Sequence, residues 1–224
     1  MNRLGKNVYS LVLLDSVVDA VDQLACERST SRSGLINQIL AEYLSCPIPE
    51  NRMRDIFTRM ESLLSGLNDF NANWQPGASI FYIRSPLHYR YHPTVRYVLE
   101  LYRESTPYFG EARASFRTQN SGLLELSEEF FRFWEALENK WIGSRFPGGK
   151  VPSETEPGRY FRRLRCPQSE SDRTSDRTAE AILAYLGEFD TDLKSYFSGV
   201  DSPEETGREV EEHYLAFLEN AIIL

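Results

Sequence analysis

The sequence of residues 7–45 predicts one short strand and two helices, a unit too small to bury a core of its own. Val8–Leu13 is rich in β-branched and aromatic side chains and is too short for a helix, so we expect a strand. Apolar side chains then recur at helical spacing after Asp15 and again after Ser31, two residues suited to cap a helix. A strand with a bare edge and two one-sided helices cannot enclose a core. We therefore expect a second copy of the chain to complete this unit.

The pattern resembles the ribbon-helix-helix family of the Arc, MetJ and CopG type. The matching pieces are the strand Val8–Leu13, the helix opening Asp15-Ser16-Val17-Val18, and the turn Ser31-Arg32-Ser33 followed by Leu35-Ile36. They cover under a fifth of the 224 residues. The resemblance implies a homodimer in which the two strands pair as a ribbon in the major groove of double-stranded DNA.

The resemblance also implies which strand residues face the DNA. In the family, alternate strand residues face the base edges and the others face the dimer core. Taking Leu13 as inward gives an inward set of Tyr9, Leu11 and Leu13. The residues then expected to face the groove are Val8, Ser10 and Val12. The family usually has polar or basic groups at such places, whereas a valine can contact only thymine methyl groups or fill space. Polar readout therefore depends on Ser10, with Lys6 and Asn7 beside it.

The start of the second helix is a candidate phosphate site. The backbone amides of Arg32 and Ser33, together with the hydroxyls of Ser31 and Ser33, suit an anion at a helix N-terminus. Arg32 adds a positive charge there. The alternative interpretation is a capped turn on a soluble helix with no ligand.

The charge of the chain is unevenly distributed. The formal net charge is −8, but residues 120–224 carry 21 Asp/Glu against 12 Lys/Arg, so the acid is concentrated in the C-terminal half. This balance is compatible with local DNA contact and argues against strong nonspecific affinity for nucleic acid.

A third amphipathic helix follows Pro49, with apolar residues at steps of three and four from Met53 to Leu67. Two interpretations stay open: the helix extends the dimer as a short coiled coil, or it packs against the domain that follows. We expect an α+β chain with a ribbon-helix-helix domain at 1–48, a linking helix at 49–76 and an α+β domain at 77–224.

The C-terminal domain shows three strand-like runs, and its expected sheet is antiparallel. The runs are Ser79–Arg84, Val95–Tyr102 and Ala112–Thr118. Arginines and tyrosines alternate through this region: Arg84, Arg90, Arg96, Arg103, Arg113 and Arg117, with Tyr82, Tyr89, Tyr91, Tyr97 and Tyr102. They suit a face for nucleic acid or another anion. The favoured alternative is a half-solvated sheet whose arginines are hydrated or paired with Glu100, Glu104 and Glu111.

Helices are expected over residues 121–142, 178–197 and 203–220. The intervening residues 143–178 are rich in Gly, Pro, Ser and charge and are expected to form a long loop, with at most a short element at Arg159–Arg165. The basic cluster Arg159, Arg162, Arg163 and Arg165 is then expected to be exposed and hydrated, with a phosphate contact as the less favoured alternative.

The sequence carries no recognised catalytic motif. It has no glycine-rich phosphate loop, nucleophile elbow or Cys-x-x-Cys pair, so we expect neither enzymatic activity nor a cofactor. His88 and His92 have the spacing of a metal pair, but they lie in a proline-bounded stretch that is poor helix, and no metal site is expected. Three widely spaced cysteines and the lack of a long apolar run favour a cytoplasmic protein without a membrane segment.

The sequence therefore predicts a homodimeric DNA-binding transcriptional regulator. The size of the C-terminal domain suggests that it binds a small-molecule or protein effector. Two alternatives remain: the N-terminal fold is used only for dimerisation and protein interaction, or the chain is an antitoxin-like repressor.

Overall fold

The structure, a computed structural model, divides the chain into two compact units, Met1–Ile48 and Pro49–Leu224. The residues that it describes are 8–28, 30–44, 48–66, 70–75, 77–87, 89, 93–103 and 107–224. None of the helices in these ranges combines the length and the apolar character that a membrane span requires.

The first unit contains the two expected helices, α1 (Asp15–Glu27) and α2 (Arg32–Tyr43). They pack through a small core whose members are Val21, Ala25 and Leu35, with Leu24 and Ile36 at its margin. Asp15 was expected as the N-cap of α1, but Leu14 holds that position and Asp15 is the first helical residue. A carboxylate there still interacts favourably with the positive end of the helix dipole.

The expected strand at the start of the first unit is not present in the single chain. Residues 8–14 belong to no helix or strand, and they precede α1 as an exposed segment. An isolated strand has no hydrogen-bonding partner, so the ribbon that the resemblance implies needs a second chain. Lys6 and Asn7 lie outside the described residues.

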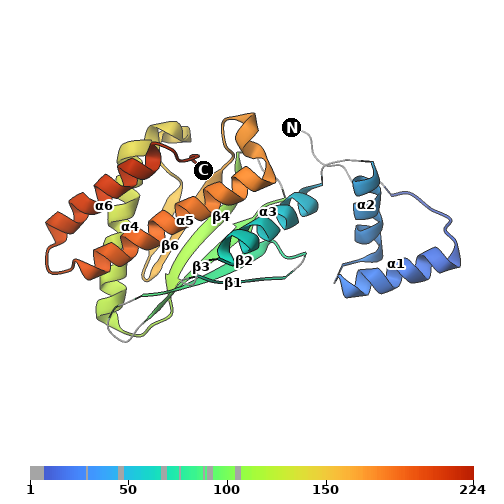
Figure 1. Cartoon of the computed structure of the whole chain (residues 1–224), viewed down its shortest axis with the longest axis horizontal. Helices are drawn as coiled ribbons and strands as arrows, with labels where there is room; N and C mark the ends of the chain where they lie inside the picture. Colours follow the sequence, from blue (N-terminus) through green and yellow to red (C-terminus); the bar gives the residue numbers. More distant parts are fainter. Residues whose placement is uncertain are drawn as a thin grey trace. The chain divides into compact units, whose positions relative to one another are not determined.

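The second unit is built on one antiparallel sheet with the strand order β1-β2-β3-β4-β6-β5 (Figure 1). The strands are β1 (Asn71–Trp74), β2 (Ile80–Pro86), β3 (Thr94–Leu101), β4 (Tyr108–Phe116), β5 (Ser153–Glu156) and β6 (Arg159–Arg165). The three expected strand-like runs are β2, β3 and β4, and the expected antiparallel sheet is confirmed. The two edge strands have only four residues each, which limits pairing with another chain.

The helices of the second unit cover one face of this sheet. They are α3 (Pro49–Leu64), α4 (Ser121–Ile142), α5 (Ser175–Ser198) and α6 (Pro203–Leu218), with short 3-10 turns at Gly143–Arg145, Pro147–Gly149 and Glu170–Arg173. α3 reaches the sheet through Phe57, whose ring centroid lies 5.3 Å from that of Phe81. α6 packs over α4, where the centroids of Tyr214 and Trp134 lie 5.1 Å apart. α3 therefore belongs to the core of the second unit.

The expectation of a long loop over residues 143–178 is wrong, although the short element expected at Arg159–Arg165 is confirmed as β6. This stretch contains the hairpin of β5 and β6, and β6 pairs with β4 inside the sheet. The hairpin turns at Pro157-Gly158, where Gly158 has φ +68°, a conformation that glycine adopts without a Cβ penalty. The basic cluster of β6 is therefore divided between the two faces of the sheet, and Arg162 is buried.

Aromatic side chains form the centre of the core between sheet and helices. The ring of Phe189 on α5 lies within 5.1–6.2 Å, centroid to centroid, of Trp134, Phe131 and Tyr160. These residues come from α4, α5 and β6, and all four are buried. The expected helix over 121–142 is confirmed as α4 and buries its wide apolar face here.

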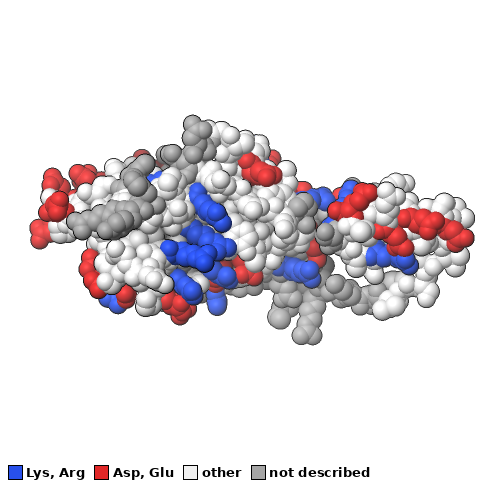
Figure 2. Space-filling model, turned by 90° about the horizontal axis from the view of Figure 1, so that it is seen from below, with Lys and Arg blue, Asp and Glu red and all other residues white. Residues whose placement is uncertain are grey.

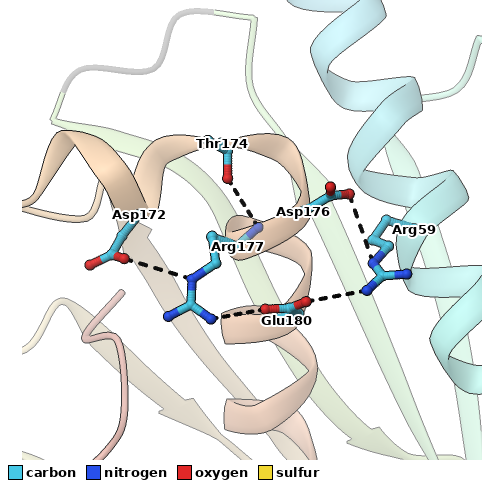
Figure 3. Close-up of polar contacts among 6 residues, drawn as sticks. All are labelled: Arg59, Asp172, Thr174, Asp176, Arg177 and Glu180. Atoms are coloured by element: carbon cyan, nitrogen blue, oxygen red, sulfur yellow. Dashed lines mark hydrogen bonds and ion pairs between the residues drawn. The ribbon is translucent and has the colours of Figure 1, made fainter.

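Ion pairs join α3 to the N-terminal turn of α5 (Figure 3). Glu180 accepts from Arg59 of α3 at 3.3 Å and from Arg177 at 3.0 Å, and these two hydrogen bonds hold its pKa below the usual value. Thr174 caps the helix by accepting from the amide of Arg177 at 3.3 Å. Asp176 lies 3.8 Å from Arg59. Because these side chains are 37–74% exposed, the network is expected to add little to stability and mainly to orient the two helices.

A buried carboxylate ties α5 to the sheet. Asp190 accepts hydrogen bonds from the hydroxyls of Ser85 on β2 at 2.9 Å and Tyr97 on β3 at 2.7 Å, and it pairs with Lys194 at 2.7 Å. Burial raises the pKa of Tyr97, and the negative charge of Asp190 raises it further, so this phenol stays a donor. The contacts set the register of α5 over two neighbouring strands.

A second buried charge cluster crosses the core near β6. Arg162 pairs with Glu138 of α4 at 2.9 Å and donates to the backbone carbonyl of Leu224 at 2.9 Å. Its guanidinium also lies 4.4 Å from the ring centroid of Tyr185. Tyr160 donates to the second oxygen of Glu138 at 2.7 Å. Burial raises the pKa of Glu138, and the charge of Arg162 opposes that change, so the carboxylate depends on its partner.

We expect Arg162→Met to lower the free energy of unfolding by about 3–5 kcal/mol, because the variant leaves Glu138 buried without a cation. The double variant Glu138→Gln with Arg162→Met should lose less unfolding free energy than Arg162→Met alone, because it leaves no buried carboxylate without a cation. All three tryptophans lie in the second unit, so urea unfolding followed by their fluorescence measures this unit. Arg163→Met, one residue further on the exposed face, is the matched control and should change stability by about 0.5 kcal/mol or less. Equal losses at positions 162 and 163 would contradict the ion-pair interpretation.

An acidic cluster lies where α5 meets α6. The side chain of Asp192 is fully buried, and its Oδ1 lies 3.3 Å from Nδ1 of the half-exposed His213. Within the described residues its Oδ2 has no hydrogen-bond donor. Burial, together with the negative charge of the nearby Glu188, raises the pKa of Asp192 to about 7, and His213 opposes the change.

The unfolding free energy should therefore fall as the pH rises from about 4 to about 7, because the folded chain retains a proton on Asp192 that the unfolded chain releases. Each pKa unit between the two states corresponds to about 1.4 kcal/mol. We expect Asp192→Asn to flatten this dependence and to be the more stable protein at pH 8, measured by urea unfolding at several pH values. Asp201→Asn, at an exposed aspartate, is the control. A wild-type slope in the Asp192→Asn variant would refute this assignment.

Candidate nucleic-acid interface

The start of α2 has the local structure that the sequence predicts. Ser31 is the N-cap, and its hydroxyl accepts from the amide of Gly34 at 3.1 Å. The first amides of a helix, here those of Arg32 and Ser33, have no acceptor within the helix and point outward along its axis. The positive end of a helix dipole is therefore presented to solvent at this turn.

Arg32 is held by a residue that the sequence analysis did not single out. Its guanidinium forms two parallel contacts with the carboxylate of Asp22 on α1, through Nε and Nη2. The hydrogen bond from Arg32 lowers the pKa of Asp22. Both side chains are exposed, so the pair is open to competition from a phosphate, which offers the same fork geometry to an arginine. Asp22 thus fixes where Arg32 lies before any anion arrives.

The segment before α1 exposes all of its side chains. Val8 and Val12, expected to face the groove, are 99% and 101% exposed. Leu11 and Leu13, expected to face inward, are 60% and 40% exposed. Tyr9, which is also expected to face inward, is 79% exposed, so the single chain leaves the expected alternation untested. Ser10 is exposed as well.

The end of α2 also leaves apolar side chains uncovered. The exposed set on this helix and just after it is Ile39, Leu40, Tyr43 and Leu44. Together with the segment 8–14 they give the first unit more exposed than buried large apolar residues. Such a concentration of apolar surface on a small unit is typical of a protein–protein interface.

The arginines and tyrosines of the second unit do not form one continuous face. Tyr97 is buried beneath the helices, whereas Arg84, Arg96 and Tyr82 lie on the opposite face of the sheet. Arg90 and Tyr91 lie outside the described residues. The expected pairing with glutamates is confirmed for Arg113, which contacts Glu100 at 2.6 Å and Glu111 at 2.5 Å.

A hollow beside α5 is the candidate effector site of the second unit. It is lined by Phe70, Thr191, Ser195 and the ion pair of Asp190 with Lys194. The ammonium group of Lys194 also lies 5.8 Å from the ring centroid of Phe70. A ligand in this hollow would meet hydroxyl groups, an aromatic ring and a neutralised ion pair, which suits a polar molecule without net charge.

No metal site is formed by the described side chains, since no group of three His, Cys, Asp or Glu residues comes together among them. The two histidines with the spacing of a metal pair, His88 and His92, lie outside the described residues.

Comparisons of the chain with models of protein families, with curated protein sequences and with solved structures find no match.

Proposed function

We propose that the chain is a homodimeric, DNA-binding transcriptional regulator whose residues 1–48 form a ribbon-helix-helix unit. The observation that carries the proposal is the combination of two packed helices, the second capped by Ser31, with an exposed apolar segment directly before them. Two such segments paired as antiparallel strands would satisfy each other's backbone groups and would cover Leu11 and Leu13. The ribbon would present Val8, Ser10 and Val12 to the major groove.

Contact with the DNA backbone would come from the start of α2. The amides of Arg32 and Ser33 and the hydroxyl of Ser33 suit one phosphate oxygen, and Arg32 would exchange Asp22 for the phosphate. Phosphate contacts of this kind fix the register of the protein on the duplex and carry no sequence information. Base discrimination would then rest on the short ribbon, with Lys6 beside it as a further cation.

The second unit would respond to an effector in the hollow beside α5. A polar, uncharged small molecule fits the groups that line it. Because Asp190 also holds α5 on β2 and β3 and pairs with Lys194, a ligand at this place would act on the contacts between α5 and the sheet.

A second candidate function is a dimerisation and protein-interaction module without DNA binding. It is favoured by one observation: Val8 and Val12, which would face the groove, are apolar and fully exposed. Such residues suit a protein surface as well as thymine methyl groups. The two functions share the dimer and differ in the outward face of the ribbon.

Neighbouring substitutions on the segment test the proposal. We expect Leu11→Glu to abolish the dimer, because it would bury a charge in the shared core, and to abolish DNA binding with it. Val12→Glu should leave the dimer intact and abolish DNA binding, since the carboxylate would face the phosphates. Sedimentation gives the oligomeric state, and gel shifts at low salt with fragments selected from genomic DNA give the binding. A monomeric wild-type protein, or equal effects of the two variants on the dimer, would disprove the ribbon.

A control at α2 separates the two candidate functions. Arg32→Ala should weaken DNA binding severalfold and leave the dimer unchanged, whereas Arg28→Ala, at the C-cap of α1, should change neither. A wild-type dimer that binds no selected fragment would instead support the interaction module.

A further inference from the structure

One face of the sheet in the second unit is not covered by the helices of that unit. Strand residues alternate between buried positions beneath the helices and exposed or half-exposed positions on the other side. Helix contacts are made by inward residues such as Phe81 and Tyr160. The outward residues therefore form a continuous surface of six strands, called here the open face.

The pairing register lines up one row of outward residues across all six strands. From β1 to β5 the row is Asn71, Arg84, Arg96, Ser115, Arg159 and Glu156. Arg84 and Arg96 are direct cross-strand partners, an arrangement of like charges that destabilises a sheet unless an anion lies between them. Arg84, Arg96 and Arg159 are exposed, and we call them the basic row.

The basic row differs from Arg113, which also points out of the same face. Arg113 is bound by Glu100 and Glu111, so its charge is neutralised within the sheet. In the described part of the chain, none of the three arginines of the basic row forms an ion pair with a carboxylate. Glu100 and Glu111 are thus held by Arg113. Glu156 is the cross-strand neighbour of Arg159 but forms no ion pair with it among the described contacts, and the exposed Arg163 on the same face also has no carboxylate partner there. In a chain of net charge −8, the basic row therefore forms a local positively charged surface. Figure 2 shows Lys and Arg side chains gathered in one patch on the second unit.

Two aromatic rings accompany the basic row. Tyr82 and Phe161 are half-exposed on the same face, one row away, next to Arg84 on β2 and Arg159 on β6. The guanidinium of Arg96 lies 4.7 Å from the ring centroid of Tyr82, so cation and ring are held together. Half-exposed rings beside unpaired arginines provide the two elements that bind a single-stranded nucleic acid: cations for the phosphates and flat surfaces on which bases stack.

We propose that the open face binds single-stranded nucleic acid, with the basic row on the phosphates and Tyr82 and Phe161 against the bases. Duplex DNA fits less well, because six strands about 4.8 Å apart make a surface about 24 Å wide. The major groove is only about 12 Å wide and admits a two-stranded ribbon. This function is separate from the duplex binding proposed for the first unit, and it does not depend on the ribbon.

The test uses the full-length chain and a fluorescein-labelled 20-nucleotide oligothymidine, followed by fluorescence anisotropy. We expect the triple variant Arg84→Ser, Arg96→Ser and Arg159→Ser to bind at least about tenfold more weakly than wild type. The slope of log affinity against log salt should fall by about 2, since about 0.7 counterions are released for each phosphate contact. Tyr82→Ala and Phe161→Ala should each weaken binding about fivefold or more.

The matched control removes three arginines from the helical side and turns of the same unit: Arg132→Ser, Arg145→Ser and Arg208→Ser. It has the same net charge as the test variant and should bind like wild type, and both proteins should unfold at similar urea concentrations. Equal losses in the two triple variants would overturn the proposal. So would displacement of the oligonucleotide by polyglutamate at equal charge concentration, which would identify the occupant as an acidic polypeptide. Binding of duplex fragments by the first unit should be unchanged in the test variant, so the two proposals fail independently.

Discussion

The alternation of side chains along six paired strands determines both how the second unit is stabilised and what it presents to solvent. Each strand buries one set of residues beneath α3, α4 and α5, and the register aligns these sets into one continuous apolar face of the sheet. The rings of Phe189, Trp134 and Tyr160 fill the space above it. The same alternation orders the outward residues into rows, so the basic row follows from the pairing that builds the core.

The secondary structure of the strongly periodic segments was predictable from the sequence. The four helices of the second unit and the strands β2, β3 and β4 follow from apolar spacing, as does the pair α1 and α2 with its cap at Ser31. The place of α3 could not be decided, because an amphipathic stripe indicates that a helix is covered and not what covers it. In the structure the stripe from Met53 to Leu64 packs into the core of the second unit.

A short element at Arg159–Arg165 was expected, but its pairing with β5 and β4 was not, because the pattern of β6 is unusual. Its inward residues are Tyr160, Arg162 and Leu164, and an arginine in the middle of an inward set breaks the expected alternation of apolar and polar residues. That arginine is tolerated because Glu138 approaches from α4, a contact that separation in sequence conceals. The dipeptide Pro157-Gly158, followed by aromatic and aliphatic residues at alternate positions, was the available signal. The Asp22–Arg32 pair was equally invisible, since it depends on how α2 folds back on α1.

The position of β6 has a consequence for how the chain acquires its structure. β4 pairs with β3 along one edge. The strand that pairs with its other edge, β6, comes later in the chain, after α4 and β5. During synthesis on the ribosome, a row of unsatisfied amides and carbonyls beside an apolar surface would persist for some seconds until β6 emerges. The nascent chain therefore passes through a stage open to association with other chains, and non-local strand closure, rather than helix formation, is expected to limit the rate of folding.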